Sequence, residues 1–178
     1  LKLLLISWTS SSLAVPFEGH KILISAPSPY AVEVGKKIFD RGGNVVDVAV
    51  AVGLTLSVTT PYYAALGGGG FALVKMEEDQ PIALDFREVA PLATSPDFYT
   101  KDSERSSRDG GSAVGVPGNP MGLYDLHKKY GKLSWKTLFG PSIKLAENGF
   151  QLSGEWIDKT EGKREKFNSS GIKYFFKE

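Results

Sequence analysis

Cysteine is absent from all 178 residues, so disulfides, thiolate catalysis and thiolate metal ligands are excluded. Histidine is scarce too: the chain has two, His20 and His127, which lie far apart in the sequence. Neither has a second potential ligand at helical spacing, a common arrangement in histidine-based metal sites. We therefore predict no metal site and no cofactor.

An excess of charge of one sign is also missing. Lysine and arginine total 21 against 20 aspartates and glutamates, for a formal net charge of +1. Nothing in this balance points to nucleic acid or to an anionic membrane surface. The longest apolar stretch, at 44–61, is too short to span a bilayer and contains Asp47. With 42% hydrophobic and 23% charged residues, the composition predicts one ordinary globular domain.

The first residues, "LKLLLISWTSSSLAVP", have their own pattern. An early Lys2 precedes an apolar run, and Ser12-Leu13-Ala14 follows as a small-x-small sequence. This pattern is typical of the remnant of a secretory signal peptide cleaved after Ala14, and a plain N-terminal tail is the alternative. We expect residues 1–19 to be this remnant and leader, with a start upstream of Leu1. The expected location of the protein is then periplasmic or extracellular.

Glycine, proline and capping residues divide the rest of the chain. Helices are predicted at 29–40, after Ser28 as N-cap, at 44–61, after Asn44, and at 119–131. A further helix at 134–149 should be interrupted at Gly140-Pro141. Strands are predicted at 21–25 and 112–117, and a hairpin at 71–76 and 81–86. Residues 97–111 should form a surface loop, and 153–178 is weakly patterned, with an aromatic end that has nothing after it to pack against. Because of the hairpin, the fold class is α+β rather than a purely parallel sheet.

The glycine run "LGGGGF" at 66–71 is the first candidate for a site. A phosphate-binding loop follows a strand, opens a helix and carries Lys-Ser/Thr. Here a helix precedes the glycines, a strand follows, and that lysine is missing. The run is therefore predicted to be a tight turn where backbone packs on backbone.

Thr59 and Thr60, in "VTTP", are the second candidate, because threonine can act as a nucleophile when a base activates it. They stand at a helix end before Pro61, where hydroxyls commonly bond back to backbone carbonyls. We predict this structural role for both.

Arg87, in "LDFREVAP", is the third candidate. A guanidinium is a planar fork that can bind a carboxylate through two hydrogen bonds, which lysine cannot imitate. Asp85 and Glu88 are close enough in sequence either to orient it or to neutralise it. From these residues alone, a carboxylate clamp and a surface ion pair both remain open.

The order of the blocks carries more information than any one of them. The chain contains "GGNVVDVAVAVGLTLSVTTP", "LGGGGF", "LDFREVAP" and "AVGVPGNPMGLYDLHKKYGKLSWKTLFGPSIKLAENGF". From about Lys21 onward these resemble the opening of the large subunit of the γ-glutamyltransferases (γ-glutamyltranspeptidases). The resemblance implies that 20–178 is the N-terminal part of that subunit, truncated. It also implies an incomplete part of the αββα four-layer sandwich of the N-terminal-nucleophile hydrolases.

The resemblance implies a function as well. Such precursors cleave themselves into a large and a small subunit, and the new N-terminal threonine attacks γ-glutamyl amides such as glutathione. The γ-glutamyl group then passes to an amino acid, a peptide or water. Arg87 matches the arginine that binds the α-carboxylate, whereas the nucleophilic threonine is expected beyond Glu178, in the small subunit. The expected alternatives are a non-catalytic truncated remnant and a related acylase or polyglutamate-processing enzyme.

Overall fold

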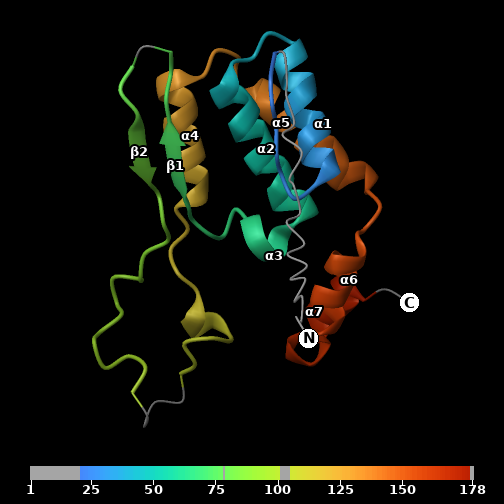
Figure 1. Cartoon of the computed structure of the whole chain (residues 1–178). Helices are drawn as coiled ribbons and strands as arrows, with labels where there is room; N and C mark the ends of the chain where they lie inside the picture. Colours follow the sequence, from blue (N-terminus) through green and yellow to red (C-terminus); the bar gives the residue numbers. More distant parts are fainter. Residues whose placement is uncertain (1–20, 78, 101–104, 177–178) are drawn as a thin grey trace, which may run out of the picture.

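The computed structural model describes residues 21–77, 79–100 and 105–176. The predicted signal-peptide remnant at 1–19, His20, and the terminal Lys177 and Glu178 lie outside these residues. In the described part, four longer helices pack together and a two-stranded hairpin lies along one side of them (Figure 1). The predicted α+β class is confirmed. No helix of this part has the length and apolarity needed to cross a membrane.

Helix α1 (Pro29–Asp40) forms where the sequence predicts it. Pro29 occupies the first turn, where its missing N–H costs nothing. Ser28 takes the N-cap position with extended backbone, but its side chain makes no capping hydrogen bond. After the helix, Gly42 adopts a φ of 88°, a conformation that favours glycine and ends the helix.

Helix α2 (Val45–Thr59) is the centre of the fold. Asn44 Oδ1 accepts hydrogen bonds of 3.0 Å from the backbone amides of Val46 and Asp47, and Asp47 Oδ2 accepts one of 3.0 Å from the Asn44 amide. This reciprocal capping box fixes where the helix begins. Val46, Val50 and Leu54 are buried in the core between α1, α4 and α5. The apolar sequence is therefore that of a helix packed on several sides.

Helix α4 (Asn119–Tyr130) begins at the predicted Asn-Pro and buries Leu123 and Leu126. Helix α5 (Trp135–Asn148) contradicts the predicted interruption, because it continues through Gly140 and Pro141. Proline removes one hydrogen bond from a helix, but Leu138 before it and Ser142 after it are both buried, and α5 packs closely against α2. Packing thus holds the helix together across Pro141.

Strands β1 (Phe71–Val74) and β2 (Ile82–Asp85) form the predicted hairpin. They pair antiparallel, with Phe71 opposite Asp85 and Val74 opposite Ile82. Ala72, Val74 and Leu84 point toward the helical core, while Phe71 and Leu73 are exposed on the opposite face. One face of this hairpin is therefore part of the core.

The predicted strand at 21–25 is not formed. This segment is free of strand pairing in the described structure, although Ile22 and Ile24 still pack against the core. A Cβ on Gly35 of α1 would lie 3.0 Å from Ile24 Cδ1, so the segment runs directly over the helix. Its alternating pattern is satisfied by packing on α1 rather than by a neighbouring strand.

Three short elements complete the middle of the chain: α3 (Pro61–Ala64), the 3-10 turn η1 (Gly111–Ala113), and a single antiparallel bridge between Val89 and Val116. The predicted strand at 112–117 is thus reduced to that one bridge. The described parts of 97–110 form turns and bends or have no regular structure, as the predicted loop requires, and Gly111 begins η1.

The C-terminal part is more ordered than its weak pattern indicates, with α6 (Gly154–Glu161), η2 (Arg164–Lys166) and α7 (Ser169–Phe175). The aromatic end does have partners. The Phe175 ring centroid lies 5.4 Å from that of Phe167 and 6.2 Å from that of Trp156. The aromatic end is therefore packed in part, since Phe175 contacts Phe167 and Trp156 while Tyr174 stays 73% exposed and Phe175 50% exposed.

Candidate functional site

Arg87 lies just past the end of β2, between two pairs of backbone hydrogen bonds. On one side Phe86 N donates to Gly70 O at 3.0 Å, and Gly70 N donates to Phe86 O at 3.3 Å. On the other side Val89 and Val116 exchange hydrogen bonds of 3.2 and 2.8 Å. The backbone of Arg87 is therefore held on both flanks.

The two flanking segments are also tied to each other. Gly68 O accepts hydrogen bonds from Gly118 N at 3.0 Å and from Asn119 N at 2.9 Å. The Asn119 side chain adds a hydrogen bond of 3.0 Å from Nδ2 to Ala65 O. We call the closed unit the Arg87 frame; it comprises residues 68–70, 86–89 and 116–119. It joins the glycine run, the end of β2 and the start of α4.

The Arg87 side chain projects from this frame into solvent and is 65% exposed. Its Nε forms an ion pair with Glu88 Oε1 at 3.9 Å, so the surface ion pair left open by the sequence is present, at a distance too long for a hydrogen bond. Asp85 acts on the backbone instead, since its Oδ1 accepts a hydrogen bond of 3.0 Å from Arg87 N. The guanidinium therefore donates no hydrogen bond within the described part of the chain, and its fork is available to a carboxylate.

The glycine run packs on this segment as predicted. A Cβ added to Gly69 would lie 2.3 Å from Glu88 N and 2.6 Å from Phe86 O. Such distances leave no room for a side chain, so Gly69 brings backbone directly against backbone.

Thr59 and Thr60 have the predicted structural role. Thr59 Oγ1 donates to Thr55 O, and Thr60 Oγ1 donates to Leu56 O, both at 3.1 Å. Both residues are buried, with 5% relative exposure. Their hydroxyl protons are therefore used within the last turn of α2.

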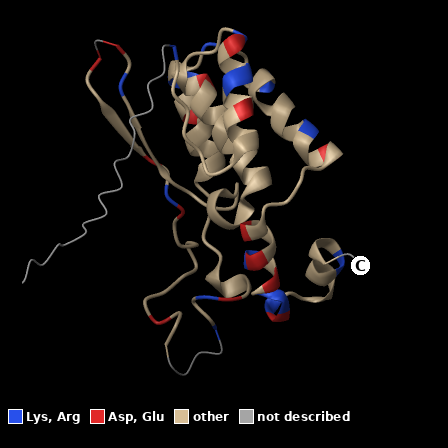
Figure 2. Ribbon diagram, turned by 45° about the vertical axis from the view of Figure 1, so that its right-hand side comes forward, with Lys and Arg blue, Asp and Glu red and all other residues tan. Residues whose placement is uncertain are grey.

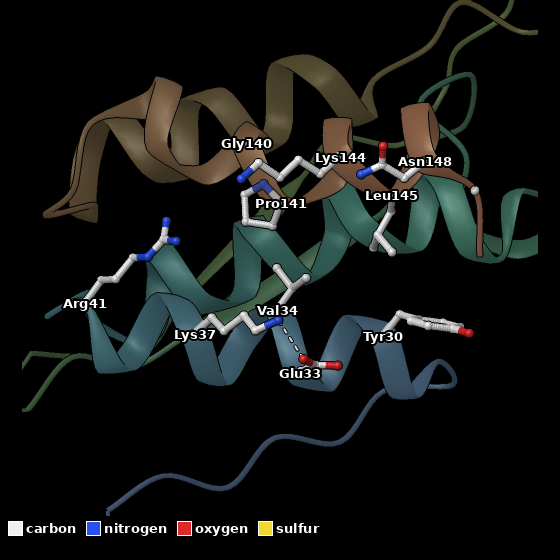
Figure 3. Close-up of a pocket in the computed structure, with 11 residues that line it drawn as sticks. Tyr30, Glu33, Val34, Lys37, Arg41, Gly140, Pro141, Lys144, Leu145 and Asn148 are labelled. Carbon is white, nitrogen blue, oxygen red and sulfur yellow. Dashed lines mark ion pairs between the residues drawn. The ribbon is translucent and has the colours of Figure 1, made fainter. Parts of the chain in front are cut away.

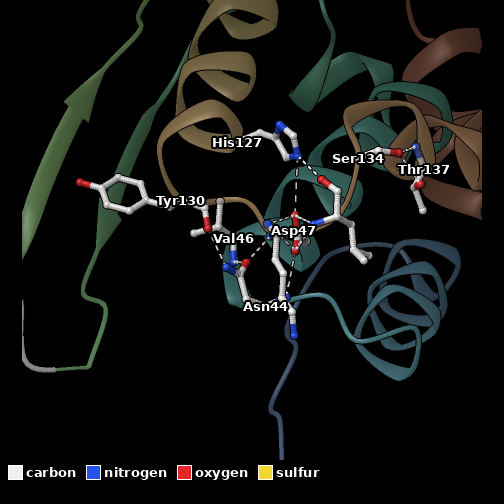
Figure 4. Close-up of polar contacts among 9 residues, drawn as sticks. Asn44, Val46, Asp47, His127, Tyr130, Ser134 and Thr137 are labelled. Carbon is white, nitrogen blue, oxygen red and sulfur yellow. Dashed lines mark hydrogen bonds and ion pairs between the residues drawn. The ribbon is translucent and has the colours of Figure 1, made fainter.

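His127 belongs to a buried polar cluster around Asp47 (Figure 4). Asp47 is fully buried, and its carboxylate accepts hydrogen bonds from the backbone amides of Lys132 and Leu133 at 3.1 to 3.3 Å. His127 Nε2 lies 2.8 Å from Leu133 O and 3.8 Å from Asp47 Oδ1. The cluster ties the start of α2 to the connection between α4 and α5. Among the described residues, no group of three or more His, Cys, Asp or Glu side chains could hold a metal ion.

A cavity of about 390 Å³ lies between α1 and α5 and is open to solvent (Figure 3). Its basic residues are Lys37, Arg41 and Lys144, and Lys37 Nζ is paired with Glu33 Oε1 at 2.6 Å. The described side chains around it include no serine, threonine or cysteine. Lysines and arginines share the helices with aspartates and glutamates (Figure 2), and in this groove Glu33 already pairs with Lys37. The candidate site is therefore the Arg87 frame.

Sequence reasoning identified Arg87 and the glycine run but missed the contribution of Gly118 and Asn119. The motif "VPGNP" does show a helix start, and nothing local reveals that its two amides bond to Gly68. The signal that could have indicated it is the unusual density of glycine in both segments.

Comparison with known proteins identifies the family to which this chain is similar. Residues 31–178 match the family model described as gamma-glutamyltranspeptidase. The chain is 42% identical over 149 residues to the glutathione hydrolase proenzyme of Pseudomonas aeruginosa, and the aligned region covers 82% of this chain and 26% of that protein. It is 42% identical over 134 residues to glutathione hydrolase 3 of Arabidopsis thaliana, covering 75% and 21% of the two chains. The crystal structure of Helicobacter pylori gamma-glutamyltranspeptidase superposes with a TM-score of 0.86 at 40% identity, covering 92% of this chain and 49% of that one.

The helices and hairpin are thus part of the N-terminal-nucleophile hydrolase fold, as predicted, and only a part of it is covered. More narrowly, the chain belongs to the gamma-glutamyltranspeptidase family. It spans about a quarter of the length of the curated relatives it matches, 26% and 21% in the two cases above.

Proposed function

We propose that the complete protein containing this chain is a γ-glutamyltransferase and glutathione hydrolase, made as a precursor, in which Arg87 binds the α-carboxylate of the γ-glutamyl group. Family membership supports the reaction class, and the names of the relatives support glutathione as a substrate. The observation that carries the role of Arg87 is its exposed guanidinium, which pairs with Glu88 only at 3.9 Å and donates no hydrogen bond to a described residue, on a backbone held from both sides.

The chemistry explains why such a clamp is useful. A γ-glutamyl amide carries a free carboxylate several bonds away from the carbonyl that reacts. Binding that carboxylate through two hydrogen bonds fixes the γ-carbonyl relative to a nucleophile, and such positioning is a large source of rate acceleration. A lysine at this position would supply the charge without the fixed geometry.

The nucleophile is supplied by polypeptide outside this chain, a threonine of the small subunit of the same precursor. Its hydroxyl oxygen bonds to the γ-carbonyl carbon, the C–N bond breaks, and the amine leaves with the proton. Water, an amino acid or a peptide then attacks the ester and releases the γ-glutamyl group. Thr59 and Thr60 are poor candidates for this role because both are buried and hydrogen-bonded to backbone carbonyls.

Export to the periplasm or the extracellular space is part of the proposal. Its support is the N-terminal sequence, with Lys2, the apolar run and Ser12-Leu13-Ala14. Fractionation of cells that express the complete protein, followed by N-terminal sequencing, tests it. A mature N-terminus at Leu1 or upstream would contradict cleavage after Ala14.

The proposed activity is tested with the complete protein and a γ-glutamyl anilide, whose hydrolysis releases a coloured amine. We expect release of the amine by the wild type and a large loss of kcat/KM in Arg87→Ala. The absence of any release by the folded, processed protein would contradict the reaction. Equal kcat/KM values for wild type and Arg87→Ala would contradict the role of Arg87.

A further inference from the structure

We propose that Gly69 and Gly118 are positioning residues for Arg87, and that they are glycines because a side chain at either position would displace the Arg87 backbone. This inference rests on the proposed role of Arg87 in binding the substrate carboxylate. It adds a second set of residues to the site, drawn from two segments that lie far from Arg87 in the sequence.

Gly118 makes the tightest contact. A Cβ built there would lie 1.9 Å from Phe86 O and 3.0 Å from Arg87 O. Because Phe86 O also accepts the hydrogen bond from Gly70 N, it cannot move away without loss of that bond. Any side chain at 118 therefore shifts the peptide that carries Arg87, or moves the start of α4 away from it.

Gly69 closes the other side. A Cβ added to Gly69 would lie 2.3 Å from Glu88 N and 2.6 Å from Glu88 Oε2. The Arg87 backbone is thus enclosed between two glycines, one before β1 and one before α4. The bond from Gly118 N to Gly68 O prevents the two sides from separating.

Backbone conformation does not require glycine at these positions. In the described part of the chain, the glycines with positive φ are Gly42, Gly110 and Gly149. Gly118 has φ −103° and ψ −23°, values that any residue adopts. The requirement at Gly69 and Gly118 is therefore for space beside Arg87.

The chain contains matched controls for this requirement. Gly67 lies in the same run as Gly69, but a Cβ there would meet nothing within 4 Å. Gly115 lies just before the bridge to Val89, and a Cβ there would meet Glu88 Cγ at 3.2 Å, a contact that a shift of a few tenths of an ångström relieves. Alanine at 67, 115, 69 and 118 thus forms a series of increasing displacement next to Arg87.

The test measures KM and kcat for a γ-glutamyl anilide with the complete, processed protein carrying each alanine, in wild-type and Arg87→Lys backgrounds. We expect no change in KM for Gly67→Ala and about a threefold rise for Gly115→Ala. For Gly69→Ala and Gly118→Ala we expect a rise of at least about tenfold. The reason is that sub-ångström misplacement of a binding group reduces productive binding. We expect kcat to change less than KM. In the Arg87→Lys background the glycine variants should add little to KM, which a general structural effect would not produce.

Folding of each variant is checked by its thermal unfolding. If Gly118→Ala does not fold, Gly69→Ala and the milder Gly115→Ala decide the question. Unchanged KM in the folded Gly69→Ala and Gly115→Ala variants would overturn the inference, as would equal effects in the two backgrounds. If Arg87→Lys alone leaves KM unchanged, the carboxylate clamp itself is wrong and the positioning role fails with it. If Arg87→Lys raises KM while the glycine series does not, the positioning role alone fails.

Discussion

The hydroxyl groups of Thr55 and Ser142 lie 3.0 Å apart in the core, where they join α2 to α5. Thr55 Oγ1 also lies 2.8 Å from Ala51 O and donates its single proton there, so Ser142 must be the donor in the bond between the two hydroxyls. Both residues are buried, with relative exposures of 0% and 5%. This bond lies one residue after Pro141 and helps explain why α5 is not broken there.

A double-mutant cycle measures this bond. We expect Thr55→Val and Ser142→Ala to show a coupling of about 1 kcal/mol in the free energy of unfolding, because each single change leaves the other partner without its hydrogen bond. Urea denaturation of the complete protein gives the four values. The control cycle pairs Thr55→Val with Ser134→Ala, whose hydroxyl bonds to Thr137 instead, and should be additive. Additivity in the first cycle would contradict a Thr55–Ser142 bond.

Asp47→Asn should lower the free energy of unfolding by about 3 kcal/mol. The buried carboxylate accepts hydrogen bonds from several backbone amides, whereas the asparagine side chain would turn an NH2 donor toward some of them. The amides affected are those of Asn44, Lys132 and Leu133. Chemical denaturation measures the change. Asp125→Asn, at an exposed position of α4, is the matched control and should have little effect. A similar loss in both variants would count against the buried cluster.

Tyr63 provides a prediction for alkaline pH. Its hydroxyl donates a hydrogen bond of 2.6 Å to Glu155 Oε1, and this bond, with partial desolvation and the charge of Glu155, raises the pKa of Tyr63 above its ordinary value of 10.0. A raised pKa means that the contribution of this bond to stability is present below pH 10 and is lost as the pH rises through the folded-state pKa.

Ultraviolet titration of tyrosinate, as the difference between wild type and Tyr63→Phe, measures the Tyr63 pKa directly. Glu155→Gln should lower it toward the ordinary value, because the carboxylate acceptor and its charge are both removed. A pKa that is the same with and without Glu155 would contradict the contact between α3 and α6.

Thr60→Ala should leave kcat for a γ-glutamyl anilide unchanged, since its hydroxyl is buried and already bonds to Leu56 O. The cost should be confined to stability, at about 1 kcal/mol for one hydrogen bond. The measurement is the kinetics of the complete protein beside its thermal unfolding. Loss of turnover in a variant that folds as well as the wild type would show that Thr60 takes part in the reaction.

Local sequence signals predicted most of the helices correctly. Pro29, the Asn44 cap and Asn119-Pro120 mark the starts of α1, α2 and α4, because caps and prolines act on the backbone of their own neighbours. The hairpin is likewise predicted from local sequence, because two apolar runs are separated by a short polar turn. The failures, at 21–25, at Pro141 and in the C-terminal part, all depend on contacts with distant residues, which no local pattern contains.

The same limit applies to the site. The place of Arg87 at the end of a strand follows from its own neighbours, and so does the turn at the glycine run. The bond between Gly68 and Gly118 joins segments that meet only in the folded chain. Asp85, expected either to orient or to neutralise the arginine, accepts a hydrogen bond from the Arg87 amide, which is an orienting contact through the backbone.

The binding of a substrate carboxylate by Arg87 is the central feature of the proposed site. The most direct test compares wild type and Arg87→Lys on a γ-glutamyl anilide and on the 4-aminobutyryl anilide, which is the same substrate without the α-carboxylate. We predict that Arg87→Lys raises KM at least about tenfold for the first substrate and leaves kcat/KM for the second unchanged, because the fork matters only when a carboxylate is present to bind it. An equal effect on both substrates, or no effect on the first, would contradict the assignment of Arg87.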